Sequence, residues 1–261
     1  MGKKIALNMD HDLFSGKTIG EICILTFKKT PLLYTADLEA KRVLLNYLEL
    51  ISSHDEIKIL LIKNASVKMD QAEYIRYYLK MIASGGDLIP LERMFSAVDQ
   101  FILKLAGLNK LVIHADSGNV ILLYMNISLA CDYRIVADNT VYQNPNVKLN
   151  VVPKGGGVFC LSKMLGTAIA SRIFLSNKEI TAIRAHQLGI VDKVVPLKDL
   201  DRVALETAQS YARLSPGYAI GIKKLLNFDI KELERYLEYE NRLLRRQIHS
   251  CHNVWKLDKN L

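Results

Sequence analysis

The chain has 261 residues, of which 50% are apolar and 24% charged, and it carries a formal net charge of +8 at pH 7. This composition excludes a disordered chain, and the length allows one main core with an appendage. The positive charge favours an acidic ligand or partner: a phosphorylated cofactor, an acidic carrier protein or nucleic acid. Nucleic acid is the weakest of the three, because the basic residues are scattered and form no stripe with aromatic residues.

The sequence favours a cytoplasmic protein. Cysteines at positions 23, 131, 160 and 251 form no paired spacing, which indicates a reducing compartment and not a disulfide framework. No run of about eighteen apolar residues is present to span a membrane, and the N-terminal stretch is too polar for a signal peptide.

Strands and helices alternate from the N-terminus. Apolar, β-rich runs at 17–27 and 57–64 flank the segment 36–53, whose apolar residues recur on one helical face. This pattern predicts a βαβ crossover.

A second crossover is predicted downstream. The segment 90–108 has apolar residues at helical spacing, and a strand at 110–118 and an apolar helix from about Asn119 follow it. Together the two crossovers predict a parallel sheet covered by helices.

The stretch YQNPNVKLNVVPKGGG at 142–157 is unusual in composition. It follows a short strand predicted at 133–138, and it consists of a short apolar strand between two prolines, followed by glycines at a helix start. Beyond about residue 160 the pattern is helical except for a strand at 191–195.

Four segments after residue 128 resemble the crotonase family, also called the enoyl-CoA hydratase/isomerase family. They are LACDYRIVADN at 129–139, PNVKL at 145–149, PKGGG at 153–157 and AHQLGIVDKVVP at 185–196. These segments match the strand, the proline segment, the glycine turn and the closing strand of the family in order and spacing.

The resemblance implies an α/β fold of the crotonase type. It implies a spiral of ββα turns over 1–199 and a C-terminal helical trimerisation region over 200–261. Members of the family bind acyl-CoA thioesters and stabilise the enolates formed from them. We therefore expect a coenzyme A thioester as substrate, with no further cofactor and no metal.

Two backbone N–H groups would stabilise the negative charge that develops on the thioester oxygen. The resemblance places these donors at Met69, which precedes Asp70, and at Leu123, which follows Gly118. Both segments depart from the family. Lys68 replaces a glycine, and Leu122-Leu123-Tyr124 replaces a run of three glycines, so side chains are expected to crowd the thioester or reshape its pocket.

The usual catalytic carboxylates are missing. The resemblance places two glutamates where this chain has Asn126 and Asn146, and the acid of some isomerases where it has Lys154. An amide can orient water but cannot exchange protons near neutral pH. We expect the wild-type protein to hydrate enoyl-CoA slowly and the double change to glutamate to raise the rate.

Other polar residues have a plain interpretation beside a functional one. Asp116 and His114 share one face of a strand and either reach the pocket or form a polar pair at a subunit contact, which is favoured. His249 is a further candidate acid. His249 and His252 have the i, i+3 spacing of one helical face and could begin a metal site, but no third ligand is evident.

Basic and glycine residues are candidates for binding the coenzyme A moiety. Lys28 and Lys29 follow a strand where the family approaches the nucleotide, so they either contact phosphate or form a solvated edge. Gly155 and Gly156, next to Lys154, either permit close packing or present free N–H groups to an anion.

Three functions remain open. The first is an acyl-CoA enzyme of the hydratase or isomerase type with an unconventional acid. The second is a decarboxylase of a malonyl-type thioester on coenzyme A or an acyl carrier protein, since loss of carbon dioxide forms the enolate without a base. The third is a non-catalytic subunit that keeps the fold and the ligand.

A trimer or hexamer is expected. The C-terminal region contains an apolar stripe that a single sheet domain need not cover. The stripe consists of Leu233, Tyr236, Leu237, Leu243, Leu244 and Ile248.

Overall fold

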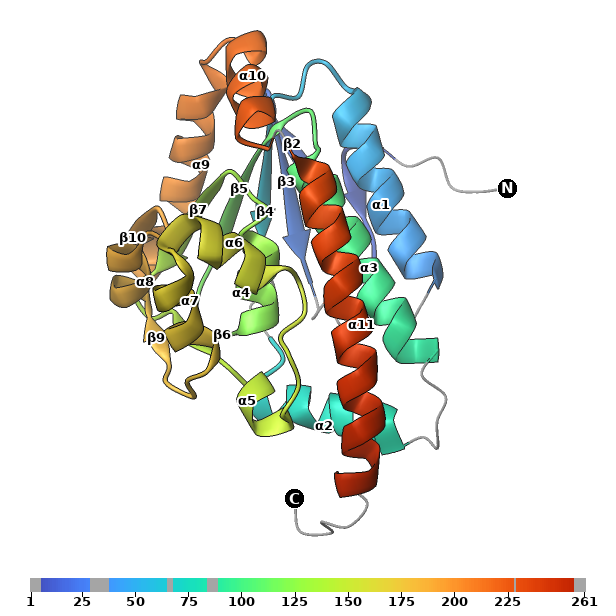
Figure 1. The fold of residues 1–261 in the computed structure, drawn as a ribbon. Coiled ribbons are helices and arrows are strands. Elements are labelled where there is room, and N and C mark those ends of the chain that lie inside the picture. The colour runs from blue at the N-terminus through green and yellow to red at the C-terminus, as the bar shows by residue number, and fades with distance from the viewer. Residues whose placement is uncertain (1–5, 29–37, 65–67, 84–88, 228, 256–261) are drawn as a thin grey trace.

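The structure is a computed structural model that describes residues 6–28, 38–64, 68–83, 89–227 and 229–255. Side chains are described for the same ranges except 81–83 and 249–255. Figure 1 shows a sheet at the centre, with helices on both of its sides.

The strands form two sheets. The larger sheet has seven strands in the order β1-β2-β3-β4-β5-β7-β10, and the smaller has three in the order β6-β8-β9. Strands β3, β4, β5, β7 and β10 are parallel, while β1 and β2 pair antiparallel at one edge. The strands are β1 (Met9–Asp10), β2 (Phe14–Ile19), β3 (Ile22–Phe27), β4 (Ile59–Lys63), β5 (Leu111–Asp116), β6 (Asn119–Ile121), β7 (Tyr133–Ala137), β8 (Val141–Gln143), β9 (Ile180–Thr181) and β10 (Lys193–Val195).

Helices cover both faces of the larger sheet. Buried residues of α1 and α3 pack on one face, and those of α9 pack on the other. The helices are α1 (Leu38–Ser53), α2 (Gln71–Ala83), α3 (Ile89–Ala106), α4 (Leu122–Ser128), α5 (Asn146–Leu149), α6 (Gly157–Leu165), α7 (Thr167–Phe174), α8 (Ala182–Leu188), α9 (Leu200–Ala212), α10 (Pro216–Leu226) and α11 (Ile230–Trp255), with a 3-10 turn, η2, at Leu197–Asp199. The predicted α/β class with a mostly parallel sheet is confirmed.

Several predicted elements differ in detail. The run 17–27 is a hairpin of β2 and β3, because Gly20 turns the chain with a φ of 56°. The predicted helix from Asn119 begins at Leu122, after strand β6. The predicted apolar strand between the two prolines contains the short helix α5.

The C-terminal helices pack on their own chain. Leu233, Leu237, Leu244 and Ile248 of α11 are buried in the same core cluster as residues of α3 and α4. The expectation that this stripe stays uncovered is therefore wrong, because α11 lies along α3 (Figure 1). The most exposed apolar side chains of the described C-terminal region lie on α10, including Leu225 and Leu226.

Candidate active site

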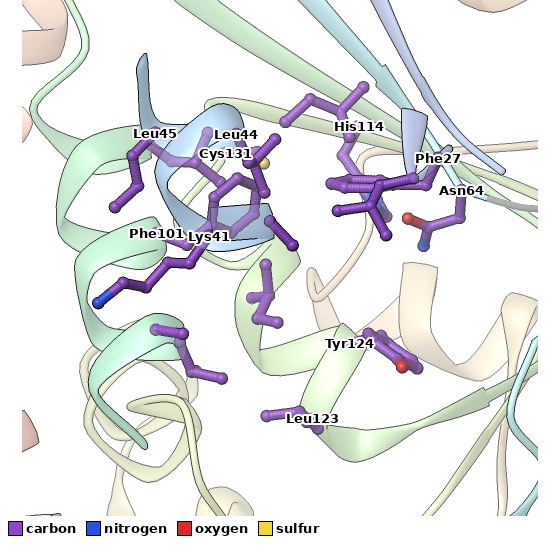
Figure 2. Close-up of a pocket in the computed structure, with 17 residues that line it drawn as sticks. Phe27, Lys41, Leu44, Leu45, Asn64, Phe101, His114, Leu123, Tyr124 and Cys131 are labelled. Atoms are coloured by element: carbon purple, nitrogen blue, oxygen red, sulfur yellow. The ribbon is translucent and has the colours of Figure 1, made fainter. Parts of the chain in front are cut away.

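A cavity of about 80 Å³ lies between the sheet and helices α1, α3 and α4. Phe27 at the end of β3 and Asn64 just after β4 border it, so it lies at the carboxyl ends of parallel strands. Leu44 of α1 and Phe101 of α3 form apolar walls. Figure 2 shows Leu123 and Tyr124 of α4 on one side of this cavity, and Phe27, Asn64 and His114 on another. Ligands commonly bind at this edge of a parallel sheet.

Leu122, Leu123 and Tyr124, which the resemblance sets against a run of glycines, form the first turn of α4. Ile121 precedes the helix in an extended conformation, and Leu122, Leu123 and Tyr124 follow. The N–H groups of a first turn have no acceptor within the helix. The side chain of Leu123 borders the cavity. The backbone N–H of Leu123 is therefore part of a helical turn next to the cavity.

Met69 and Asp70 lie at the start of α2. Met69 is 5% exposed. Asp70 accepts a hydrogen bond at 2.7 Å from the backbone N–H of Glu73, and the Glu73 carboxylate accepts one at 3.0 Å from the backbone N–H of Asp70. This reciprocal pair caps α2. The structure thus gives Asp70 a capping role, and its expected contact with coenzyme A stays a prediction.

Asn126 and Asn146 are buried away from the cavity, and neither is among the residues that line it. Asn126 donates from Nδ2 to the backbone oxygen of Lys154 at 2.8 Å, and a β-carbon added at Gly157 would overlap its amide. Asn146 Nδ2 lies 3.5 Å from the backbone oxygen of Val152. The chain itself therefore packs on both side chains, and their expected catalytic role stays a prediction.

The glycine loop has the backbone expected of a tight turn. Gly155 and Gly156 have φ values of 102° and 68°, which side chains rarely adopt. Their N–H groups donate to the carboxylate of Glu240 of α11 at 2.8 Å and 3.0 Å. Of the two alternatives for these glycines, close packing is therefore favoured over free N–H groups, because a carboxylate of the same chain accepts from both N–H groups.

Lys154 is also committed within the protein. Its side chain is fully buried, and its ammonium pairs with Asp99 of α3 and, at 3.0 Å, with Glu240. Burial raises the pKa of Glu240, while Lys154 and the two glycine N–H groups act in the opposite direction. This closed network ties the glycine loop to α3 and α11, and the expected contact of Lys154 with substrate stays a prediction.

Asp116 is held by neighbours at the end of β5. Its carboxylate accepts hydrogen bonds from Lys68 and, at 2.6 Å, from Nδ2 of Asn64. Lys68 also donates to the backbone oxygen of Ser117. Asp116 does not border the cavity, so its candidacy as an unconventional acid there finds no support.

The remaining candidates lie elsewhere. Lys28 pairs with Asp10 at the edge of the sheet. Gly118 donates its backbone N–H to Oδ1 of Asn139 at 3.2 Å, in the turn between β5 and β6. Lys29 and the side chain of His249 lie outside the described residues. Their expected contacts with coenzyme A, and the acid role expected of His249, stay predictions.

His114 is the titratable residue that the sequence flagged and that does reach the cavity. The side chain is buried, and burial lowers its pKa to about 4, although the nearby Asp116 acts in the opposite direction. The imidazole is therefore neutral at pH 7.

This lowered pKa predicts acid sensitivity. Between pH 6.5 and about 4 the unfolded chain binds a proton that the folded chain does not, so stability falls as the pH falls through this window. The loss should be about 3 kcal/mol. Denaturant melts of wild type and His114→Gln at pH 7 and pH 4.5 give the loss of unfolding free energy in each protein. The loss in wild type minus the loss in the variant is the contribution of His114, because Glu240 has the same opposite effect in both proteins. Equal acid losses in both proteins would contradict the assignment.

Two acids of the buried network, Asp99 and Glu240, were not singled out from the sequence. A signal was present, because Glu240 interrupts the apolar stripe between Leu237 and Leu244. Asp99 likewise lies between Phe95 and Ile102 on the buried face of α3. A charge within an apolar helical face requires a buried partner.

The described residues contain neither a metal-binding cluster nor a helix that could span a membrane. No group of three or more histidine, cysteine, aspartate or glutamate side chains there is arranged to hold a metal ion. In the same part of the chain, each helix is too short or too polar to cross a membrane.

Sequence comparison identifies relatives. A sequence model described as enoyl-CoA hydratase/isomerase matches residues 80–254. The chain is 28% identical over 177 residues to a probable mitochondrial enoyl-CoA hydratase of Dictyostelium discoideum, covering 66% of this chain and 63% of that protein. It is 31% identical over 143 residues to the 2,3-dehydroadipyl-CoA hydratase of Escherichia coli K12, covering 52% of this chain and 56% of that protein. The matches thus span roughly half to two thirds of these relatives.

Solved structures share the fold over more of the chain. The enoyl-CoA hydratase of Bacillus halodurans superposes with a TM-score of 0.79 at 16% identity, covering 92% of this chain and 97% of that one. A putative enoyl-CoA hydratase/isomerase of Acinetobacter baumannii gives a TM-score of 0.73 at 20% identity, covering 94% and 99%.

Proposed function

Because the chain belongs to the enoyl-CoA hydratase/isomerase family, we propose that it binds a short acyl-CoA thioester at the cavity beside Leu123 and stabilises the enolate formed from it. The backbone N–H groups of Met69 and Leu123 are the proposed donors to the thioester oxygen. Donors held in place where water is excluded stabilise developing negative charge strongly.

The position of Leu123 carries this proposal. Its side chain borders the one cavity that lies between α4 and the carboxyl ends of β3 and β4 in the described structure. The family resemblance selects the same residue on sequence grounds alone. An acyl group that enters the cavity therefore passes the first turn of α4.

The proposal includes no glutamate pair for proton transfer. Asn126 and Asn146 cannot exchange protons, and both are packed into the protein. General acid–base groups typically contribute about 10²–10⁴-fold to rate. Hydration of an enoyl-CoA by this protein should accordingly be slow.

Two alternatives follow from the same observations. A decarboxylase of a malonyl-type thioester needs the oxyanion donors but no base, which suits a cavity without a carboxylate lining. A non-catalytic acyl-CoA-binding subunit suits the closed network of Lys154, Asp99 and Glu240, which fixes the glycine loop.

Calorimetry and turnover assays test the proposal. Coenzyme A and butyryl-CoA should bind with micromolar to millimolar dissociation constants, and added salt should weaken binding because phosphate contacts are partly exposed. Crotonyl-CoA and malonyl-CoA then separate hydration from decarboxylation, while binding without turnover supports the non-catalytic alternative. Absence of binding for every thioester, including one on an acyl carrier protein, contradicts the proposal.

We also propose a trimer or hexamer, which exposed apolar side chains of α10 support. Tyr218, Leu225 and Leu226 of α10 are 62%, 72% and 80% exposed, and exposed apolar side chains on one helix are typical of an interaction surface. Light scattering that gives a monomer at micromolar concentration would contradict this assembly.

A further inference from the structure

Two side chains give the mostly apolar cavity a polar end. His114 of β5 and Asn64, just after β4, border it together with the ring of Phe27. Figure 2 shows the ammonium of Lys41 directed away from His114 and Asn64. The polar end thus consists of one imidazole and one amide on neighbouring strands.

The orientation of the Asn64 amide is fixed by its hydrogen bond to Asp116. Its Nδ2 donates to Oδ2 of Asp116 at 2.6 Å, and the ion pair with Lys68 holds that carboxylate in place. An ionised carboxylate only accepts hydrogen bonds, so the amide cannot flip. Its Oδ1 is therefore directed away from Asp116, toward Phe27 (Figure 2). The cavity gains a fixed hydrogen-bond acceptor.

His114 has hydrogen-bonding capacity that the described protein does not use. The side chain is 5% exposed, and no side chain or backbone group of the described residues forms a hydrogen bond with its ring. Because burial lowers its pKa to about 4, the ring is neutral at pH 7 and carries one N–H donor. Because His114 borders the cavity, this N–H is available to a ligand that supplies an acceptor.

We propose that His114 and Asn64 form a hydroxyl-binding subsite, so that the acyl group taken into the cavity is short and carries a hydroxyl. A hydroxyl can donate to Oδ1 of Asn64 and accept from the N–H of His114, whereas a carbonyl can only accept. This inference rests on the proposed function, since it takes the acyl group into the same cavity.

The size of the cavity limits the chain. An apolar cavity of about 150 Å³ accommodates benzene. The cavity here is about 80 Å³, which suits an acyl group of roughly four carbons. Neither Asn126 nor Asn146 borders it, so the subsite is separate from the positions of the family's glutamates.

Calorimetry with a matched panel tests the subsite. Wild-type protein is titrated with butyryl-CoA and with the coenzyme A thioesters of 2-, 3- and 4-hydroxybutyrate. At least one hydroxybutyryl-CoA should bind about tenfold more tightly than butyryl-CoA, because two otherwise unmade hydrogen bonds form. His114→Phe should abolish this preference, His114→Gln should keep most of it, and the control His186→Phe, on exposed α8, should keep all of it.

The outcomes separate this inference from the proposed function. Equal binding of butyryl-CoA and all three hydroxybutyryl thioesters by wild type overturns the subsite and leaves the proposed function standing. Failure of every thioester to bind overturns both. The wild-type panel is decisive by itself if the His114 variants do not fold.

Discussion

Lys154→Met should lower the free energy of unfolding by about 3–5 kcal/mol at pH 7, because it removes the cation from between two buried carboxylates. The Lys154 side chain is fully buried, and those of Asp99 and Glu240 are 14% and 3% exposed. Methionine keeps a flexible apolar chain of similar length, so packing changes little. Urea denaturation followed by circular dichroism measures the change.

Lys163→Met is the matched control. Lys163 pairs with Glu232, but the two side chains are 56% and 44% exposed. An exposed pair of this kind contributes about 0–1 kcal/mol. A loss for Lys154→Met no larger than that of the control would contradict the claim that a buried charge network fixes the glycine loop.

Asn126→Glu should also destabilise the protein by about 3–5 kcal/mol, because it buries a carboxylate without a cation. A carboxylate cannot donate to the backbone oxygen of Lys154, as the amide does at 2.8 Å, and the added methylene has Gly157 as its neighbour. The same denaturation assay measures the loss. Asn119→Glu, at an exposed position of β6, is the control and should change stability by less than about 0.5 kcal/mol.

The hydration activity of the double variant Asn126→Glu with Asn146→Glu distinguishes the expectation from the sequence from the expectation from the structure. The sequence alone predicts that Asn126→Glu with Asn146→Glu raises enoyl-CoA hydration. The structure predicts no gain, since neither position borders the cavity. A folded double variant that hydrates crotonyl-CoA faster than wild type would show that substrate reaches these positions.

Much of the fold could be predicted because its signals are local. The helix at 90–108 and the strand at 133–138 follow from apolar spacing, and the structure places α3 and β7 there. The hairpin at 17–27 was missed because β2 and β3 are both apolar and only Gly20 marks the turn. Helix α5 was missed because four residues contain too little periodicity to distinguish a helix from a strand.

The candidate site was less predictable because its contacts join distant segments. The resemblance located Leu123, but no local pattern shows that Glu240 reaches the glycine loop across about 85 positions. Because His114 and Asp116 are two residues apart in a predicted strand, the sequence places both on one face. Only the structure distinguishes His114, which borders the cavity, from Asp116, which Lys68 and Asn64 hold.

The binding site of the acyl group can be observed in a crystal structure of the protein with butyryl-CoA. We expect the thioester oxygen about 2.7–3.1 Å from the backbone nitrogen of Leu123. We expect the butyryl chain in the cavity, between Phe101 and His114. A butyryl chain packed against the side chains of Asn126 and Asn146, or a thioester bound outside the cavity, would contradict the proposed site.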